Sequence, residues 1–241
     1  YTNMGAMLGA DDGYYGMAFH DNDDLYYSRN ITHNLLGYSE GFMGFGNGME
    51  KLISRAWPES DLEMMQYTLP MYVDQQPFSV YYMTVSGHTN YTTNGNSMST
   101  KNWDAVKDME GGHMVKAYLA CQLELEYALE YTVRYLEEAG VLDDTVIVLT
   151  ADHYPYGMEK SVAWESDRDN LAELYGYPAD SNPARDHNAL IIWSPCLEEM
   201  DPITVSAPTY SLDILPTLSN LFGLEYDSRF LVGRDVFSDT M

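Results

Sequence analysis

The chain has 241 residues, 45% of them hydrophobic, so it can bury one sizeable core and needs no second domain. It carries 37 acidic and 12 basic side chains, for a formal charge of −25. This excess argues against nucleic acid or an anionic membrane as a partner of the general surface. No apolar run is long enough to span a bilayer, and no signal-like start is present.

Three apolar segments are typical of β-strands, and each leads into a histidine. They are 15–19 before His20, 78–85 before His88, and 145–151 before the adjacent pair Asp152 and His153. The β-branched run before Asp152 predicts a buried parallel strand. Open α/β sheets place their chemistry at the carboxyl ends of their strands, so we expect these side chains to share one crevice.

Each of these polar residues, taken alone, also has an ordinary structural explanation. A histidine can cap the loop after a strand, and an aspartate can accept hydrogen bonds from backbone amides. Asp152 and His153 can instead turn the same way and converge on one divalent cation. The repetition of histidine at three strand ends favours the functional interpretation.

Helical patterns occupy three other stretches of the chain. The longest is 113–139, where apolar residues recur at helical spacing and Gly140 provides the stop. A second helix is predicted to begin at Glu59 or Ser60 and to continue to Tyr72. The third is 211–222, with Gly223 as its cap.

Two polar stretches, 90–108 and 154–188, are predicted to be long loops beside the strand ends. Long excursions in a compact domain commonly carry function, so we expect both to form walls of a substrate crevice. His33, His113 and His187 are expected to be surface or capping residues.

Six groups of short motifs follow one another along almost the whole chain. They are Ala18–His20 with Tyr26–Arg29 and Leu36–Tyr38, then Met83–Thr89, Leu149–Tyr154, Ala189–Pro195, Ser211–Leu218 and Gly233–Phe237. In this order they resemble the lipoteichoic acid synthase branch of the alkaline phosphatase and sulfatase superfamily, the phosphoglycerol transferases of Gram-positive bacteria. Any one motif is weak evidence, whereas six in register are strong.

The resemblance implies an α/β fold, the alkaline phosphatase/sulfatase-like sandwich with a central, mostly parallel sheet and helices on both faces. Residues 1–241 are then a single catalytic domain that is incomplete at its amino-terminal end. In the family, an acidic metal ligand and a Thr or Ser nucleophile precede the segment that matches Ala18–His20. Nothing in Tyr1–Gly16 resembles either element, so we expect a missing segment, possibly supplied as a separate chain.

The resemblance also implies a divalent metal ion. Asp152 and His153 match the family's paired ligands for Mn²⁺, and an oxygen with a nitrogen ligand suits a borderline cation. Zn²⁺, Mg²⁺ and Ca²⁺ remain open alternatives.

His20, Arg29 and His88 match family positions that hold the phosphate and glycerol of the substrate. Arginine suits this role because its planar fork of donors meets two phosphate oxygens at once. Tyr27 stands where some relatives carry Trp, as a wall of the substrate site. His88 or His20 could protonate the leaving oxygen, since imidazole titrates near neutral pH.

The implied activity is metal-dependent phosphoglycerol transfer from phosphatidylglycerol head groups, for lipoteichoic acid or another cell-envelope glycan. The parent protein is expected to be anchored in the cell membrane with its catalytic domain outside the cell, while this piece alone is soluble and inactive. One alternative is a sulfatase or phosphodiesterase that uses water as acceptor. Another is a non-catalytic module that binds anionic glycerol phosphates.

Overall fold

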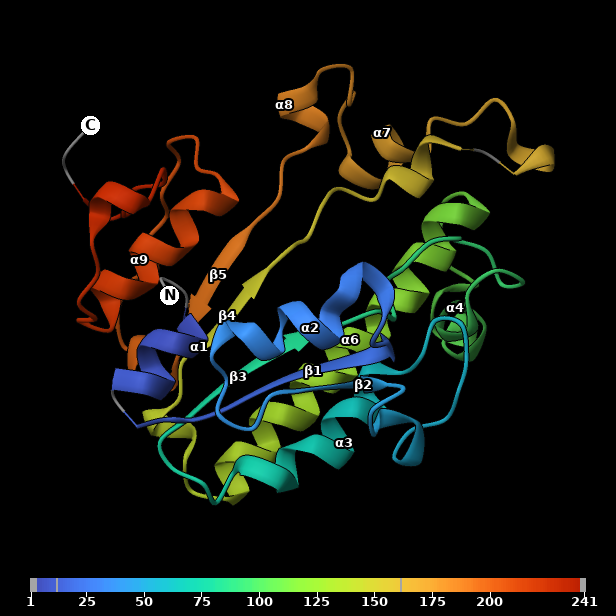
Figure 1. The fold of residues 1–241 in the computed structure, drawn as a ribbon. Coiled ribbons are helices and arrows are strands. Elements are labelled where there is room, and N and C mark those ends of the chain that lie inside the picture. Colours follow the sequence, from blue (N-terminus) through green and yellow to red (C-terminus); the bar gives the residue numbers. More distant parts are fainter. Residues whose placement is uncertain (1–3, 12, 161, 239–241) are drawn as a thin grey trace.

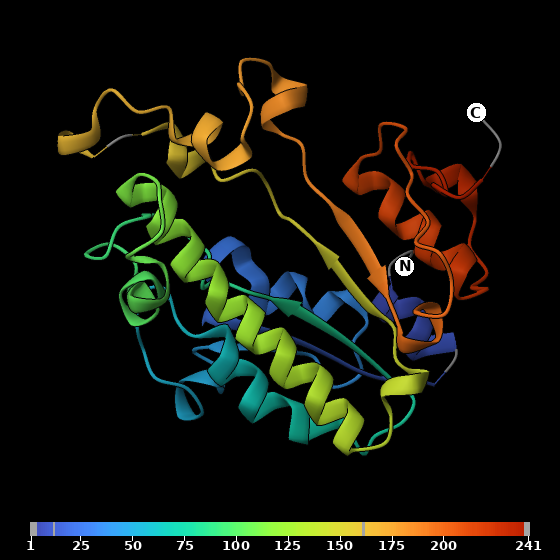
Figure 2. The same ribbon diagram turned by 180° about the vertical axis from the view of Figure 1, so that it is seen from behind.

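The centre of the fold is a three-stranded parallel sheet between two layers of helices (Figure 1). The computed structural model describes residues 4–11, 13–160 and 162–238. The strand order is β2-β1-β3, formed by Phe42–Phe45, Tyr15–Asp23 and Phe78–Met83. Figures 1 and 2 show helices on both faces of this sheet. The predicted sandwich, with a mostly parallel central sheet, is confirmed.

The main core lies between this sheet and two helices, α3 (Asp61–Tyr72) and α6 (His113–Glu138). Phe19, on the central strand, is fully buried, and its ring stacks on Tyr82 of β3 with centroids 5.3 Å apart. A central parallel strand covered on both faces is largely apolar, and Met17, Ala18 and Phe19 of β1 are buried.

Both helices were predicted from sequence and are confirmed. Ser60 caps α3, where its hydroxyl accepts a hydrogen bond from the Glu63 N–H at 3.1 Å. α6 ends at Glu138, and Gly140 follows with a positive φ of 72°, the conformation that glycine adopts without strain.

The prediction of a buried parallel strand at 145–151 is wrong in its pairing. β4 (Ile147–Thr150) pairs antiparallel with β5 (Leu190–Trp193), and the two form a separate two-stranded sheet. Most of β4 is only half-buried. A β-branched apolar run predicts a strand in an apolar setting, but it specifies neither the partner nor the direction.

The two stretches predicted as loops contain short helices, so the prediction of uninterrupted loops is wrong. α4 (Ser97–Lys101) and α5 (Trp103–Val106) lie in the first, α7 (Asn170–Tyr175) and α8 (Asn182–Arg185) in the second. The polar residues that suggested loops are partly helix caps. The Asn96 side chain accepts the Ser99 N–H at 2.7 Å, and the Asp169 side chain accepts the Ala172 N–H at 3.0 Å.

The remaining elements are short. They are α1 (Met4–Ala6), a π turn at Met7–Asp11, α2 (Arg29–Thr32), α9 (Ile214–Leu221), and single 3₁₀ turns at Tyr26–Ser28, Asn34–Leu36, Met49–Lys51, Leu142–Asp144, Tyr156–Glu159, Ala163–Glu165, Pro195–Leu197, Ser211–Asp213 and Ser228–Phe230. α9 with its preceding turn confirms the helix predicted at 211–222. Among the described residues, no helix is both long and apolar enough to cross a membrane.

We expect Ser60→Ala to lower the free energy of unfolding by about 2 kcal/mol, because it removes the cap of α3 and a hydrogen bond to a buried carboxylate. The Ser60 hydroxyl donates to Glu124, which is fully buried on α6 and also accepts from Lys101 Nζ at 2.8 Å. Urea denaturation measures the change. Ser166→Ala, at an exposed serine, is the control, and equal effects of the two substitutions would contradict this account.

Candidate active site

His20 lies within β1 and not at its end, because the strand continues for three more residues to Asp23. The expectation that β1 finishes in a histidine is therefore wrong. In the parallel ladder, however, His20 is paired with Met83, the last residue of β3. The His20 side chain therefore stands level with the carboxyl end of β3, where site residues of a parallel sheet are expected.

The surroundings of His20 fix its tautomer. Its Nδ1 lies 2.8 Å from the Met83 carbonyl oxygen, so Nδ1–H donates and Nε2 carries the lone pair. Arg29 Nη1 lies 3.5 Å from that Nε2. Burial, with a smaller contribution from the Arg29 charge, lowers the pKa of His20 to about 4. A neutral His20 is a poor general acid, so His88 is the better candidate of the two for that role.

Arg29 begins α2 directly after two residues with left-handed backbone, Tyr27 and Ser28, each with φ of 54°. Such a conformation is uncommon for residues other than glycine and commonly marks functional sites. The guanidinium carbon lies 5.4 Å from the ring centroids of both Tyr26 and Tyr27. Among the residues that the structure describes, no carboxylate forms an ion pair with Arg29. Its forked donors can therefore receive an anion.

His88 lies in the tight turn that follows β3. The buried carboxylate of Asp61 holds this turn, since it accepts hydrogen bonds from the backbone N–H groups of Val85 (2.8 Å) and Ser86 (3.2 Å) and from the Ser86 hydroxyl. His88 Nδ1 lies 3.0 Å from the Thr89 carbonyl oxygen, so Nε2 is the nitrogen that it can offer to a substrate. The Trp57 ring contacts the imidazole, with centroids 5.1 Å apart.

Asp152 and His153 follow β4 directly and are adjacent in space as well as in sequence. His153 Nε2 lies 3.6 Å from Asp152 Oδ2, and His153 Nδ1 lies 2.7 Å from the Tyr154 carbonyl oxygen. The Asp152 side chain is 97% exposed. One nitrogen and one oxygen donor suit a borderline divalent cation, but within residues 4–11, 13–160 and 162–238 no group of three or more candidate ligands comes together.

The loop after β4 packs on the loop after β3. Gly157 lies so close to the Thr89 side chain that any Cβ at this position would collide with it. Tyr81, on β3, is close enough to Asp152 and to Arg29 for both charges to act on its hydroxyl group. Burial and the charge of Asp152 raise the pKa of Tyr81, while Arg29 lowers it. Arg29 and the metal-ligand candidate Asp152 are therefore both near Tyr81.

His33 was expected to be a surface or capping residue, and the structure places it elsewhere. It is half-buried, with its ring 4.9 Å from that of Phe42 and 6.0 Å from that of Tyr81. Burial and the Arg29 charge lower its pKa. No motif marks His33 in the sequence. Its place beside Phe42 and Tyr81 depends on contacts between segments that are far apart in the sequence.

Asp21, next to His20, is a second residue that sequence reasoning missed. Its carboxyl group is fully buried, and its pKa lies well above 3.8 because of burial and the neighbouring Asp61 charge. Asp61 already accepts three hydrogen bonds from the turn before His88. Asp21 therefore holds a proton to higher pH than an ordinary aspartate does.

Comparison with known proteins defines the class that this fold and site represent. The sulfatase family model matches residues 1–224, so the chain belongs to the sulfatase family. The fold is similar to that of a solved protein in the alkaline phosphatase superfamily from Vibrio parahaemolyticus, with a TM-score of 0.62 and 16% identity, over 98% of this chain and 51% of that one.

The chain is also similar to one lipoteichoic acid synthase-like protein and to one lipoteichoic acid synthase of known structure. The chain is 22% identical to the lipoteichoic acid synthase-like YvgJ of Bacillus subtilis, over 93% of this chain and 35% of that protein. The structure of the lipoteichoic acid synthase LtaP from Listeria monocytogenes matches with a TM-score of 0.72 at 21% identity, over 97% of this chain and 55% of that one. The chain thus spans about a third of the length of its curated relatives.

We expect the stability of the protein to fall as the pH rises above 3.8, the ordinary pKa of an aspartate, because the folded state holds the Asp21 proton to higher pH than the unfolded state does. Asp21→Asn keeps a neutral donor at this position and should flatten that decline. Urea denaturation across this pH range measures the slope. The exposed Asp167→Asn is the control, and an unchanged slope for Asp21→Asn would refute the assignment.

Proposed function

We propose that the chain is part of a metal-dependent phosphoglycerol transferase. Its substrate is the head group of phosphatidylglycerol, and its product belongs to lipoteichoic acid or another cell-envelope glycan. The observation that carries the proposal is the Arg29 guanidinium, which lies beside the neutral His20 at the end of a parallel sheet. The sulfatase family match and the similarity to a lipoteichoic acid synthase support it.

Arg29 binds the phosphate through two parallel N–H donors. In a protein of formal charge −25, an anionic head group needs such a local cation to overcome the average field. His20 keeps the guanidinium in place, because its Nε2 accepts from Arg29 while its Nδ1 is tied to Met83. Tyr27 forms a wall against the glycerol.

His88 protonates the leaving oxygen through Nε2, and the turn that Asp61 holds fixes the position of its backbone. The proposed nucleophile is a Thr or Ser oxygen in a part of the catalytic domain outside this chain, of which residues 1–241 would be one incomplete domain. That oxygen forms a bond to phosphorus while the bond from phosphorus to the diacylglycerol oxygen breaks, and diacylglycerol leaves. An acceptor hydroxyl then displaces the phosphoglycerol group from that residue.

Asp152 and His153 would hold the divalent metal ion, Mn²⁺ in first place and Zn²⁺, Mg²⁺ or Ca²⁺ as alternatives. A bound metal ion supplies Lewis-acid stabilisation of the phosphoryl oxygens and of the nucleophile. The two donors lie 3.6 Å apart on an accessible loop. Such a pair fits a metal site whose remaining ligands come from other residues. The parent protein is proposed to be anchored in the cell membrane, with this domain facing outward.

A hydrolase of the same family is the second candidate. The matching family model is described as sulfatase, and a sulfate ester offers the same tetrahedral oxygens to Arg29. The acceptor distinguishes the two functions. A hydrolase releases free glycerol phosphate or sulfate to water, whereas the transferase passes the group to a glycan or polyglycerolphosphate hydroxyl.

In the complete enzyme we expect Arg29→Lys to slow the release of diacylglycerol from phosphatidylglycerol nearly as much as Arg29→Ala, by about tenfold or more, because lysine keeps the charge and loses the paired donors. Arg229→Lys is the matched control, since that arginine is exposed and paired with Asp227. Near wild-type release by Arg29→Lys would remove Arg29 from the phosphate site.

A further inference from the structure

The turn that carries His88 is held by more than the Asp61 carboxylate. The His88 N–H donates to the Val85 carbonyl oxygen at 2.9 Å, and Asp61 accepts the N–H groups of Val85 and Ser86. The carbonyl oxygens of Ser86 and His88 accept from the side-chain amide of Asn96, whose Nδ2 lies 3.2 Å and 2.8 Å from them. Asn96 therefore binds the carbonyl groups of the turn, while Asp61 binds its N–H groups.

Asn96 is 1% exposed, and both polar atoms of its side chain have partners. Its Oδ1 accepts the Ser99 N–H as the cap of α4, and its Nδ2 donates to the turn. Among side chains of this length, only asparagine offers an acceptor and two donors together. A buried amide is stable only where its donors are satisfied, so these hydrogen bonds fix the turn against the start of α4.

The next residue, Ser97, places the aromatic neighbour of His88. The Ser97 N–H donates to the Trp57 carbonyl oxygen at 2.8 Å, and the Ser97 hydroxyl oxygen accepts the Trp57 N–H at 3.3 Å. The Trp57 ring contacts the His88 imidazole. Asn96 and Ser97 together therefore determine the position of the His88 backbone and of the ring beside its side chain.

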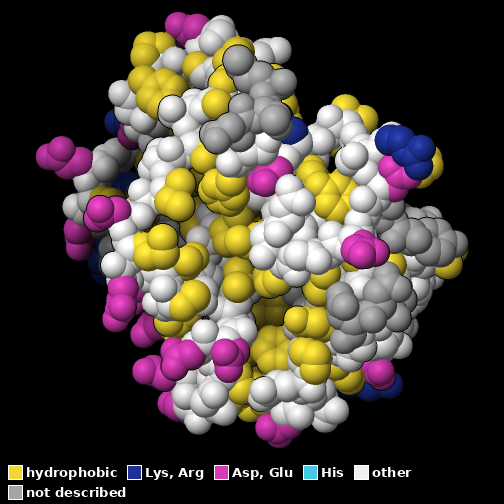
Figure 3. All heavy atoms as spheres, turned by 90° about the vertical axis from the view of Figure 1, so that its left-hand side faces the viewer, with side chains coloured by type: hydrophobic (Ala, Val, Ile, Leu, Met, Phe, Trp, Pro, Cys, Tyr) yellow, Lys and Arg dark blue, Asp and Glu magenta, His cyan; other side chains and the backbone are white. Residues whose placement is uncertain are grey.

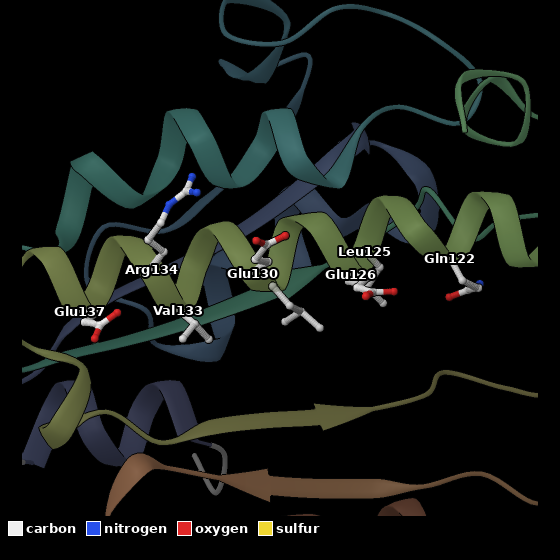
Figure 4. A pocket seen from close by; sticks show the side chains of 8 residues that line it. Gln122, Leu125, Glu126, Glu130, Val133, Arg134 and Glu137 are labelled. Atoms are coloured by element: carbon white, nitrogen blue, oxygen red, sulfur yellow. The ribbon is translucent and has the colours of Figure 1, made fainter. Parts of the chain in front are cut away.

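The helix α6 also contacts the turn. The Gln122 side chain lies where a Cβ of Gly87 would stand, so α6 packs directly on the residue before His88. Figure 4 shows Gln122 at one end of a row of side chains along α6. The Ser99 hydroxyl donates to the Ala117 carbonyl oxygen at 2.6 Å, which ties α4 to the same helix. α4 and α6 therefore form one support for the turn.

The His88 turn differs in this respect from the exposed apolar surface of the molecule. Seen from the left-hand side of Figure 1, apolar side chains gather in a hollowed band in the middle of the molecule (Figure 3). No described residue covers that band, and no contact identifies a partner for it. The contacts that hold the turn are all among described residues, and they lead to a side chain of the candidate site.

We propose that Asn96 is a positioning residue that holds His88 for the transfer reaction. The inference rests on the proposed function, in which the Nε2 proton of His88 goes to the diacylglycerol oxygen as the bond from phosphorus to that oxygen breaks. Asn96 is too buried to touch a substrate and acts through the carbonyl oxygens of Ser86 and His88. The His88 ring follows its backbone, because Nδ1 lies 3.0 Å from the carbonyl oxygen of the neighbouring Thr89.

Asn96→Ser separates the two roles of this side chain. A serine hydroxyl can still accept the Ser99 N–H and cap α4, but it offers no amide group to the turn. Asn102→Ser is the matched control at the other end of α4, where Asn102 Nδ2 donates to the Ala120 carbonyl oxygen (3.2 Å) and to Glu124 Oε2 (3.1 Å). The control removes two hydrogen bonds of the same kind, neither of them to the turn.

Steady-state release of diacylglycerol by the complete enzyme measures the effect. We expect Asn96→Ser to lower kcat for phosphatidylglycerol by about tenfold or more with an unchanged KM, and Asn102→Ser to leave kcat within about twofold of wild type. With a p-nitrophenyl ester of glycerol phosphate, whose leaving group needs no proton, Asn96→Ser should also stay within about twofold. Equal losses on the two substrates, or an equal loss with Asn102→Ser, would overturn the proposal.

The imidazole resonances of the 241-residue chain give a readout that does not depend on activity. We expect Asn96→Ser to shift the nuclear magnetic resonance signals of His88 and to leave those of His20 in place, whereas Asn102→Ser shifts neither. Unmoved His88 signals would also overturn the proposal. A complete enzyme that releases no diacylglycerol would overturn the proposed function instead, and the His88 signals would still decide whether Asn96 positions the imidazole.

Discussion

The burial of carboxylates in the interior of this acidic chain is the constraint on which the rest of the structure depends. Asp61, Asp21 and Glu124 are all nearly or fully removed from water, and such groups are tolerated only where donors or a shared proton satisfy them. Asp61 therefore holds the turn before His88, Asp21 keeps its proton to higher pH, and Glu124 joins α6 to Ser60 and Lys101. The position of His88 in the candidate site therefore depends on the hydrogen bonds of Asp61.

The excess of carboxylates also bears on the anionic substrate proposed for this chain. The average surface repels phosphate, so the useful cation must stand apart from carboxylates. Arg29 achieves this through the left-handed residues Tyr27 and Ser28, which turn the chain after β1 and bring the guanidinium against His20. Because His20 stays neutral, the positive charge remains on the arginine and is not shared with a second cation.

The sequence predicted those parts of the fold whose signals are local. Apolar periodicity marked α6, and the serine cap marked α3, because both depend on neighbouring residues. Local signals cannot report the partner of a strand, so β4 was expected in the central sheet and pairs instead with β5. His33 was expected at the surface and Asp21 was not singled out for the same reason, since the chain folds both inward from positions that carry no motif. The strand-end residues were predicted from their positions after apolar runs and then by resemblance to a family, and the structure packs the loop after β4 on the loop after β3.

The central claim is that His20 with Arg29, His88 and the Asp152–His153 pair serve one site. The direct measurement is a nuclear magnetic resonance titration of the chain with sn-glycerol 1-phosphate in the presence of Mg²⁺, a diamagnetic stand-in for Mn²⁺, which follows the imidazole resonances. We predict that those of His20, His88 and His153 shift along one shared saturation curve, while His113, held between Trp103 and Trp164 at the start of α6, does not respond. Separate curves, or a response of His153 alone, would contradict the claim.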